Sequence, residues 1–140
     1  MHRLITLFIF LALSACSQDD PPADDYDPGR DYFTFADTNA FVTEHLALDL
    51  DVDFERRELR GFAMLSMRRL DPEAGVLVLD TRDLRIDSVT ILENGNSSPA
   101  GFEFGESHVL LGTPLRIELP DTTGESFDVM IEYATSPEST

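Results

Sequence analysis

The alternation of apolar and polar residues is clearest between Leu46 and Phe54. In this stretch every second residue is apolar, and the positions between them are alanine or aspartate. A period of two is typical of a β-strand with one buried face and one solvated face. A polar segment, 55–58, follows, and a second apolar run extends over 59–67. Two such runs joined by a short polar loop predict a β-hairpin.

The rest of the chain is also predicted to form short strands separated by turns. The run 76–79 is continuously apolar, so we expect it to be buried on both faces. The run 84–92 loses its alternation near Asp87-Ser88, which indicates a bulge, and Asn94-Gly95-Asn96 marks a turn. Further strands are predicted at 102–104, 109–111, 115–119 and 127–133. Strands at this spacing predict an all-β fold, either a sandwich or a curved open sheet.

The first fifteen residues have the features of a targeting segment. His2-Arg3 precede an almost unbroken apolar run, and small residues stand just before Cys16, the single cysteine of the chain. This arrangement resembles a bacterial lipoprotein signal, in which Cys16 would become the lipidated first residue. A membrane-spanning anchor fits less well, because a spanning helix needs about 20 apolar residues. A buried thiol also fits less well, because polar residues follow Cys16 directly.

These features divide the chain into three parts. We expect a signal peptide at 1–15 and a disordered acidic tether at 16–30, since the latter is rich in aspartate and proline. A β-rich domain is expected at 31–140, with the aromatic residues of 31–36 docked on its edge. The lipoprotein resemblance implies a place in the bacterial cell envelope, anchored through Cys16 and facing the periplasm. In bacterial lipoproteins an aspartate directly after the lipidated cysteine favours the inner membrane. Here Ser17 stands at that position, so the resemblance implies the outer membrane.

The charge of the chain excludes one class of partner. There are 27 acidic residues against ten arginines and no lysine, which gives a net charge of −17. Such a chain repels phosphates, so we expect no nucleic-acid partner. Solubility is the simplest consequence of the acidity.

Local motifs for catalysis or metal binding are absent from the sequence. It contains three histidines but no H-E-x-x-H, C-x-x-C or G-x-S-x-G motif. The aspartates at 49, 51 and 53 have the spacing of a calcium loop, but Phe54 stands where glycine is needed and Arg60 where glutamate is needed. In a strand these carboxylates would also be about 7 Å apart. We therefore predict no catalytic, cofactor-binding or metal-binding residue, and lipidation at Cys16 alone.

Several segments together resemble one family. Their order and spacing along the chain match the opening of the zinc aminopeptidases of the leukotriene A-4 hydrolase type, peptidase family M-1. The matching segments are Asp31-Tyr32-Phe33-Thr34-Phe35-Ala36-Asp37, Val42 to Phe54, Leu59-Arg60-Gly61, Val78 to Leu84 with Ile86 and Val89, and Ile131 to Ser139, which contains a Tyr-x-Thr-Ser-Pro sequence.

The resemblance implies a saddle-like or sandwich N-terminal β-domain with antiparallel and mixed pairing, which covers and shapes the active site of a separate catalytic domain. In that family zinc activates water to release amino acids from peptide N-termini. The zinc ligands, the catalytic tyrosine and the Gly-x-Met-Glu-Asn loop have no counterpart here, so no activity is expected of the chain alone. The expected partners are the missing catalytic domain, the peptide substrates of the parent enzyme and the membrane. We expect the chain to be a fragment or truncated reading frame, incomplete at its C-terminus.

Two other functions remain open at this stage. The chain could be a freestanding envelope lipoprotein with a β-sandwich that binds a protein or peptide. It could also be the start of a catalytically inactive relative that serves as a scaffold.

Overall fold

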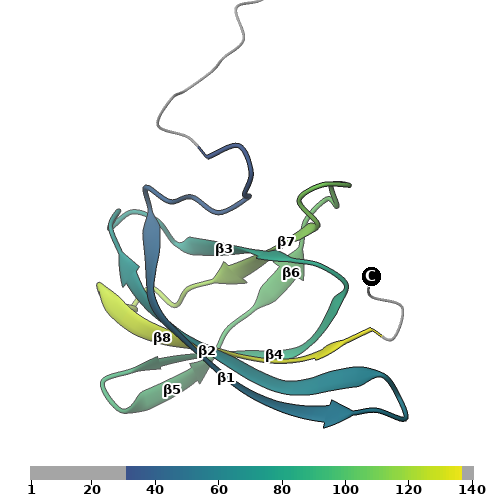
Figure 1. The fold of residues 1–140 in the computed structure, drawn as a ribbon. Helices are drawn as coiled ribbons and strands as arrows, with labels where there is room; N and C mark the ends of the chain where they lie inside the picture. Colours follow the sequence, from purple (N-terminus) through teal and green to yellow (C-terminus); the bar gives the residue numbers. More distant parts are fainter. Residues whose placement is uncertain (1–30, 137–140) are drawn as a thin grey trace, which may run out of the picture.

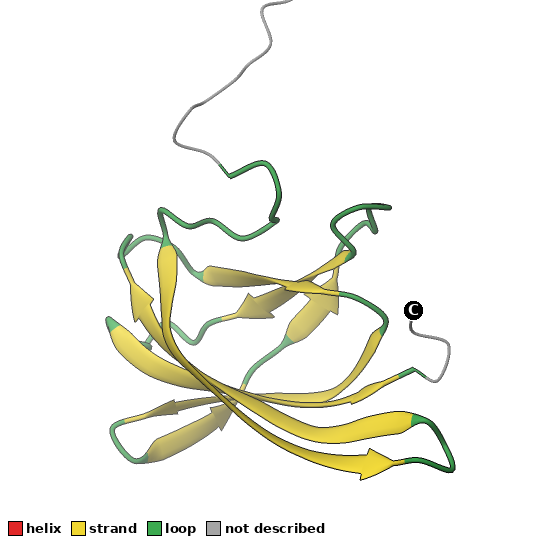
Figure 2. Ribbon diagram, viewed as in Figure 1, coloured by secondary structure: helices red, strands yellow, loops and turns green. Residues whose placement is uncertain are grey.

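The structure, a computed structural model, describes residues 31–136 as two packed β-sheets (Figures 1 and 2). Sheet A has five strands in the order β1-β2-β8-β4-β5, and sheet B has three in the order β3-β7-β6. The strands are β1 (Phe41–Asp53), β2 (Glu58–Arg69), β3 (Val76–Thr81), β4 (Leu84–Glu93), β5 (Asn96–Pro99), β6 (Phe102–Phe104), β7 (Thr113–Glu118) and β8 (Ser126–Thr135).

The predicted all-β class is confirmed. Every strand pairing in the described range is antiparallel, so the mixed pairing that was also expected does not occur there. No helix within residues 31–136 is long and apolar enough to span a membrane. The predicted signal peptide, the tether and Cys16 lie outside the described residues.

The predicted hairpin is confirmed as β1 and β2. Their register runs from Leu46 opposite Leu65 to Asp53 opposite Glu58. β1 begins five positions before the alternating stretch, at Phe41, because a bulge between Thr43 and His45 interrupts the alternation without ending the pairing.

Gly61 allows the two strands of this hairpin to cross closely. A Cβ atom at this position would lie 1.9 Å from the backbone oxygen of Asp49 on β1. Any side chain would therefore push β1 away from β2. The tight pairing of the hairpin thus explains why glycine stands in the Leu59-Arg60-Gly61 segment near the start of β2.

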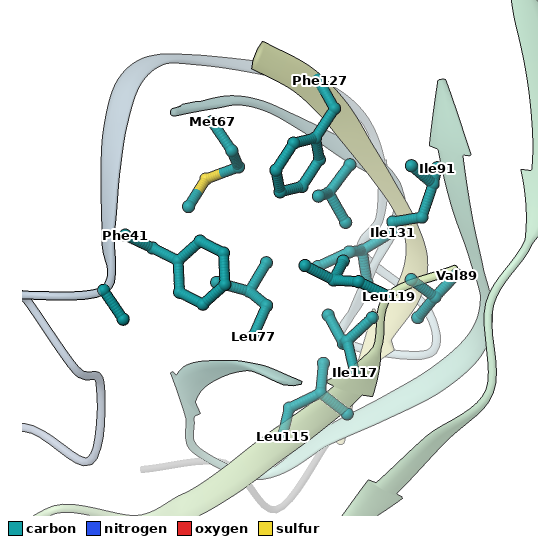
Figure 3. Packing of buried hydrophobic residues seen from close by; sticks show 12 residues of the cluster. Phe41, Met67, Leu77, Val89, Ile91, Leu115, Ile117, Leu119, Phe127 and Ile131 are labelled. Atoms are coloured by element: carbon teal, nitrogen blue, oxygen red, sulfur yellow. The ribbon is translucent and has the colours of Figure 1, made fainter. Parts of the chain in front are cut away.

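The hydrophobic core lies between the sheets at one end of the molecule. Sheet A contributes Met67 and Phe127, and sheet B contributes Leu77, Leu115 and Ile117. Figure 3 shows these side chains pointing toward one another, with the ring of Phe41 among them. The Phe41 and Phe127 rings meet edge to face with centroids 6.4 Å apart, a favourable aromatic geometry. We call this end of the sandwich the closed end.

The turn and the bulge predicted around β4 are both present. Asn94 and Gly95 have positive φ angles of 50° and 78°, which are the conformations of a type I′ hairpin turn. This turn joins β4 to β5, a four-residue strand that the sequence pattern did not predict. The register of β4 against β8 shifts between Ile86 and Ser88, where the bulge was expected.

Two of the predicted strands differ from the structure. The segment 109–111 is a turn in which Val109 and Leu110 are exposed. The backbone N–H and C=O groups of His108 and Gly112 hydrogen-bond to each other and close this turn. The run 76–79 is part of β3, but it is not buried on both faces. Sheet B faces sheet A on one side only, so that Leu77, on the inner face, is buried whereas Val76, on the outer face, is exposed.

The segment that leads into β1 is held to β3 by polar groups, and of its phenylalanines Phe35 is half-buried. The Thr34 hydroxyl and the Phe35 N–H both donate to the carboxylate of Asp80 in β3. The Phe33 ring is 86% exposed. The expected docking on the domain edge therefore occurs, with Asp80 as its acceptor.

Candidate interaction surface

The long hairpin carries an apolar surface that the rest of the described structure leaves open. On β1 the inward-facing residues Leu46, Leu48 and Val52 are 52%, 56% and 54% exposed. In Figure 1 the β1–β2 hairpin extends beyond sheet B, which covers only the other end of sheet A. We call this end of the molecule, with the inner faces of β1 and β2 from Leu46 to Leu65, the open end.

The open end contains an apolar groove between the two sheets. Leu48 of β1, Leu65 of β2 and Leu79 of β3 are part of its lining. Ile131 and Tyr133 of β8 line it as well, and its volume is about 370 Å³. Contiguous exposed apolar surface of this kind marks sites where proteins contact a partner. The groove therefore offers a place for apolar side chains from outside the described residues.

The outer face of the same hairpin is acidic. Asp49 and Asp51 point away from the groove and are exposed, as predicted for a solvated strand face. Asp53 accepts hydrogen bonds from the backbone N–H groups of Glu55 and Arg56, at 3.0 and 2.9 Å, and so shapes the turn after β1. The hairpin thus presents apolar side chains on one face and carboxylates on the other.

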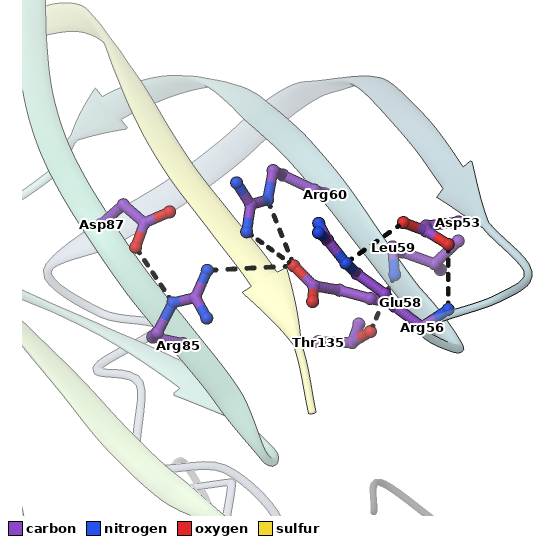
Figure 4. A network of polar contacts seen from close by, with 8 residues as sticks. All are labelled: Asp53, Arg56, Glu58, Leu59, Arg60, Arg85, Asp87 and Thr135. Atoms are coloured by element: carbon purple, nitrogen blue, oxygen red, sulfur yellow. Dashed lines mark hydrogen bonds and ion pairs between the residues drawn. The ribbon is translucent and has the colours of Figure 1, made fainter. Parts of the chain in front are cut away.

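A polar network fastens the outer face near the tip of the hairpin (Figure 4). The Glu58 carboxylate of β2 forms an ion pair with Arg60, with an N–O distance of 2.9 Å. The same carboxylate lies 3.9 Å from the guanidinium of Arg85 in β4. Arg85 also pairs with Asp87 at 3.1 Å. Ala134 of β8 pairs with both arginine positions and is fully buried beneath these contacts. The network joins β2 to β4 across β8, so its role is to hold these strands together.

The histidines of the described residues do not form a reactive site. His45 is exposed on β1, which agrees with a surface position. His108 uses its Nδ1 to accept the N–H groups of Leu110 and Leu111, so it closes a turn. Within residues 31–136 no three His, Cys, Asp or Glu side chains are grouped closely enough to hold a metal ion.

A second hollow, of about 540 Å³, lies at the closed end between the end of β2 and the start of β8. Arg68, Arg69 and Glu125 are among its lining residues. Arg68 is already paired with Glu44 at 2.6 Å.

The sequence pattern predicted the apolar row of β1 but not its exposure. The available signal was a difference in length between strands. β1 has 13 residues, whereas β3 and β7 have six each. At about 3.3 Å per residue, strands that short cannot cover the full length of the hairpin.

Comparison with known proteins gives a consistent result. The chain is 38% identical over 108 residues to leukotriene A-4 hydrolase of Xenopus laevis, and the match covers 76% of this chain. It is 33% identical over 113 residues to leucine aminopeptidase 2 of Yarrowia lipolytica, which covers 81% of this chain. No family model matches the sequence.

The fold agrees with the sequence matches. The structure of yeast LTA4 hydrolase in complex with bestatin aligns with a TM-score of 0.69 and 27% identity, over 92% of this chain. That match covers 19% of the yeast chain, and the matches to the Xenopus and Yarrowia relatives each cover 17% of the relative. Sequence and fold together show that the chain is homologous to the N-terminal region of leukotriene A-4 hydrolase and of the related M-1 leucine aminopeptidases.

Proposed function

We propose that this chain is a non-catalytic β-domain of a lipid-anchored zinc aminopeptidase, which covers and shapes the active site of a catalytic region outside the chain. The observation that supports this most directly is the bare apolar face of the open end. Leu46, Leu48 and Val52 would be covered if a further part of the protein packed on the hairpin. Burial of such side chains stabilises an interface by about 25 cal/mol per Å² of apolar area.

In this proposal the residues of this chain take no direct part in the catalytic reaction. Zinc would supply a Lewis acid and an activated water, but the described residues do not fit a zinc site, since they contain no suitable group of ligands. The residues of this chain would instead hold the sheet in place and exclude water from the covered surface. Purified chain with added zinc is expected to show no turnover of aminoacyl-anilides.

A domain exchange tests the proposed role. The matched region of the Yarrowia leucine aminopeptidase 2 would be replaced by residues 31–136 of this chain. We expect the chimera to be soluble and to release leucine from a leucyl-anilide at a rate within tenfold of the parent. A matched control deletes the exchanged region, and this deletion is expected to abolish activity. A folded but inactive chimera would contradict the proposed role and favour a freestanding binding protein.

The proposed anchor is tested separately in a bacterial host. Lipidation at Cys16 predicts that Cys16→Ala moves the protein from the membrane fraction to the soluble fraction and removes the lipid mass from its N-terminal peptide. Ser17→Ala is the matched control and is expected to leave the protein in the outer membrane. Ser17→Asp is expected to shift the protein to the inner membrane. Unchanged fractionation of the Cys16 variant would contradict the anchor.

A further inference from the structure

The hollow at the closed end is lined by an arginine whose charge no described residue balances. Arg69 is half-buried, and its Nε is a buried atom without a hydrogen-bond partner among the described residues. Within residues 31–136 its guanidinium forms no ion pair, whereas the neighbouring Arg68 is paired with Glu44. Buried polar groups in folded proteins are nearly always hydrogen-bonded. Arg69 is therefore a group that needs a partner.

A carboxylate on the wall of the same hollow is also unpaired. Glu125 lines the hollow together with Arg69, and the Arg69 backbone N–H donates to the Glu125 carbonyl at 2.7 Å. The two backbones are therefore adjacent. Even so, no ion pair joins the two side chains, and Glu125 forms none with another residue of 31–136. Two opposite charges thus line one hollow without neutralising each other.

Part of the wall of the hollow is apolar. Leu70, which is 45% exposed, and Pro72, which is also exposed, are among the lining residues. The volume of the hollow is about 540 Å³, and sites for small molecules measure about 300–1,000 Å³. A ligand that matches this wall carries an anionic group, a cationic group and an apolar part.

The charge of the chain favours a zwitterion over a simple anion. The chain has a net charge of −17, so a free anion is repelled before it reaches Arg69. An α-amino acid has no net charge, because it carries a carboxylate and an ammonium on the same carbon atom. Its carboxylate matches the paired N–H donors of a guanidinium, and its ammonium is attracted to a carboxylate.

We propose that the hollow at the closed end binds a free α-amino acid with an apolar side chain. The ligand carboxylate pairs with Arg69, and the ligand ammonium pairs with Glu125. Its side chain lies against Leu70 and Pro72. Peptidase action of the larger protein would release such amino acids. That source of the ligand rests on the proposed function, whereas the site itself does not.

Three small molecules test the chemistry of the site on the purified chain. L-Leucine carries both charges, 4-methylpentanoate lacks the ammonium, and 3-methylbutylamine lacks the carboxylate. Binding is measured by isothermal titration calorimetry, and shifts of the Arg69 and Gly124 amide signals in nuclear magnetic resonance spectra locate it. We expect L-leucine to bind about tenfold more tightly than either fragment, because each fragment loses one of the two charge pairs. Equal affinity for leucine and 4-methylpentanoate, or no binding of leucine, would overturn the inference.

Variants of the chain assign the two charge pairs. Arg69→Gln and Glu125→Gln are each expected to weaken leucine binding about tenfold. Arg57→Gln and Asp51→Asn are the matched controls, since both residues are exposed on the long hairpin and neither forms an ion pair with another described residue. Both controls should leave binding unchanged. Glu125 is exposed, so Glu125→Gln is expected to fold even if Arg69→Gln does not. Unchanged leucine affinity in folded Glu125→Gln would overturn the inference.

The domain exchange distinguishes this inference from the proposed function. An active chimera, made from a chain that does not bind leucine, would overturn the amino-acid site and leave the proposed function in place. An inactive chimera, together with leucine binding that depends on Arg69 and Glu125, would support the site and contradict the assigned role.

Discussion

The closed and open ends of this molecule use the same strands and the same alternating pattern, yet they differ in what covers them. At the closed end Met67 and Phe127 are 3% and 4% exposed beneath sheet B. At the open end Leu48, on the same face of the same sheet, is 56% exposed. An alternating pattern therefore shows which face of a strand is apolar, but not whether a second layer covers that face.

The difference follows from the lengths of the strands. β1 and β2 have 13 and 12 residues, and the longest strands of sheet B have six. At about 3.3 Å per residue, the hairpin is roughly twice as long as the layer above it. The remaining length is stabilised within the chain mainly by backbone pairing and by the polar network around Glu58.

The largest effect is expected in the closed end. Ile117 is fully buried, so Ile117→Ala removes its contacts and leaves a cavity, and should lower the free energy of unfolding by about 2–5 kcal/mol. Urea denaturation followed by far-ultraviolet circular dichroism measures this loss. A cost below about 1 kcal/mol would show that the closed end is not the stabilising core.

A smaller but clear effect is expected within the hairpin of the open end, where Gly61 lies opposite Leu50. In Gly61→Ala the added Cβ would lie 1.9 Å from the Asp49 oxygen, so the hairpin must separate locally. We expect a loss of about 1–3 kcal/mol in the free energy of unfolding and faster amide exchange along β1. Gly75→Ala is the matched control, because a Cβ there meets nothing within 4 Å. Similar losses in both variants would contradict close crossing as the reason for this glycine.

The polar network should contribute less. Glu58→Gln weakens the contacts to Arg60 and Arg85 across the outer face, and we expect it to lower stability by about 0.5–1 kcal/mol. The arginine side chains are 58% exposed and the Glu58 side chain is 15% exposed. Salt should therefore screen the arginine charges, and the loss should shrink when sodium chloride is raised to 1 M. A loss that does not change with salt would mean that Glu58 acts through packing instead.

The smallest effect on stability is expected at the open end. Leu48→Ala removes a side chain that is already half exposed, so the free energy of unfolding should change by no more than about 0.5 kcal/mol. Binding of a hydrophobic dye should fall, since this residue lines the groove. A loss as large as that of Ile117→Ala would show that the open end is covered in solution, for example by self-association.

Much of the fold could be predicted from the sequence because its strands alternate strongly. The hairpin of β1 and β2, the bulge in β4 and the turn at Asn94 were all predicted by local pattern. The strand predicted at 109–111 is a turn instead. Backbone hydrogen bonds between His108 and Gly112 close a tight turn around these three apolar residues. The strand expected at 76–79 is present but is buried on one face only, because a continuous apolar run does not show whether a second layer covers its other face.

The sequence by itself determined the all-β class, the apolar and acidic faces of the hairpin, and the absence of local catalytic motifs. These features depend on residues close together in the chain, where backbone geometry sets the relation between neighbours. Only the tertiary structure decided that sheet B covers one end of sheet A, and that β1 keeps a free edge beside a bare groove. Coverage depends on how strands distant in the chain stack and how far each extends, which no local period records.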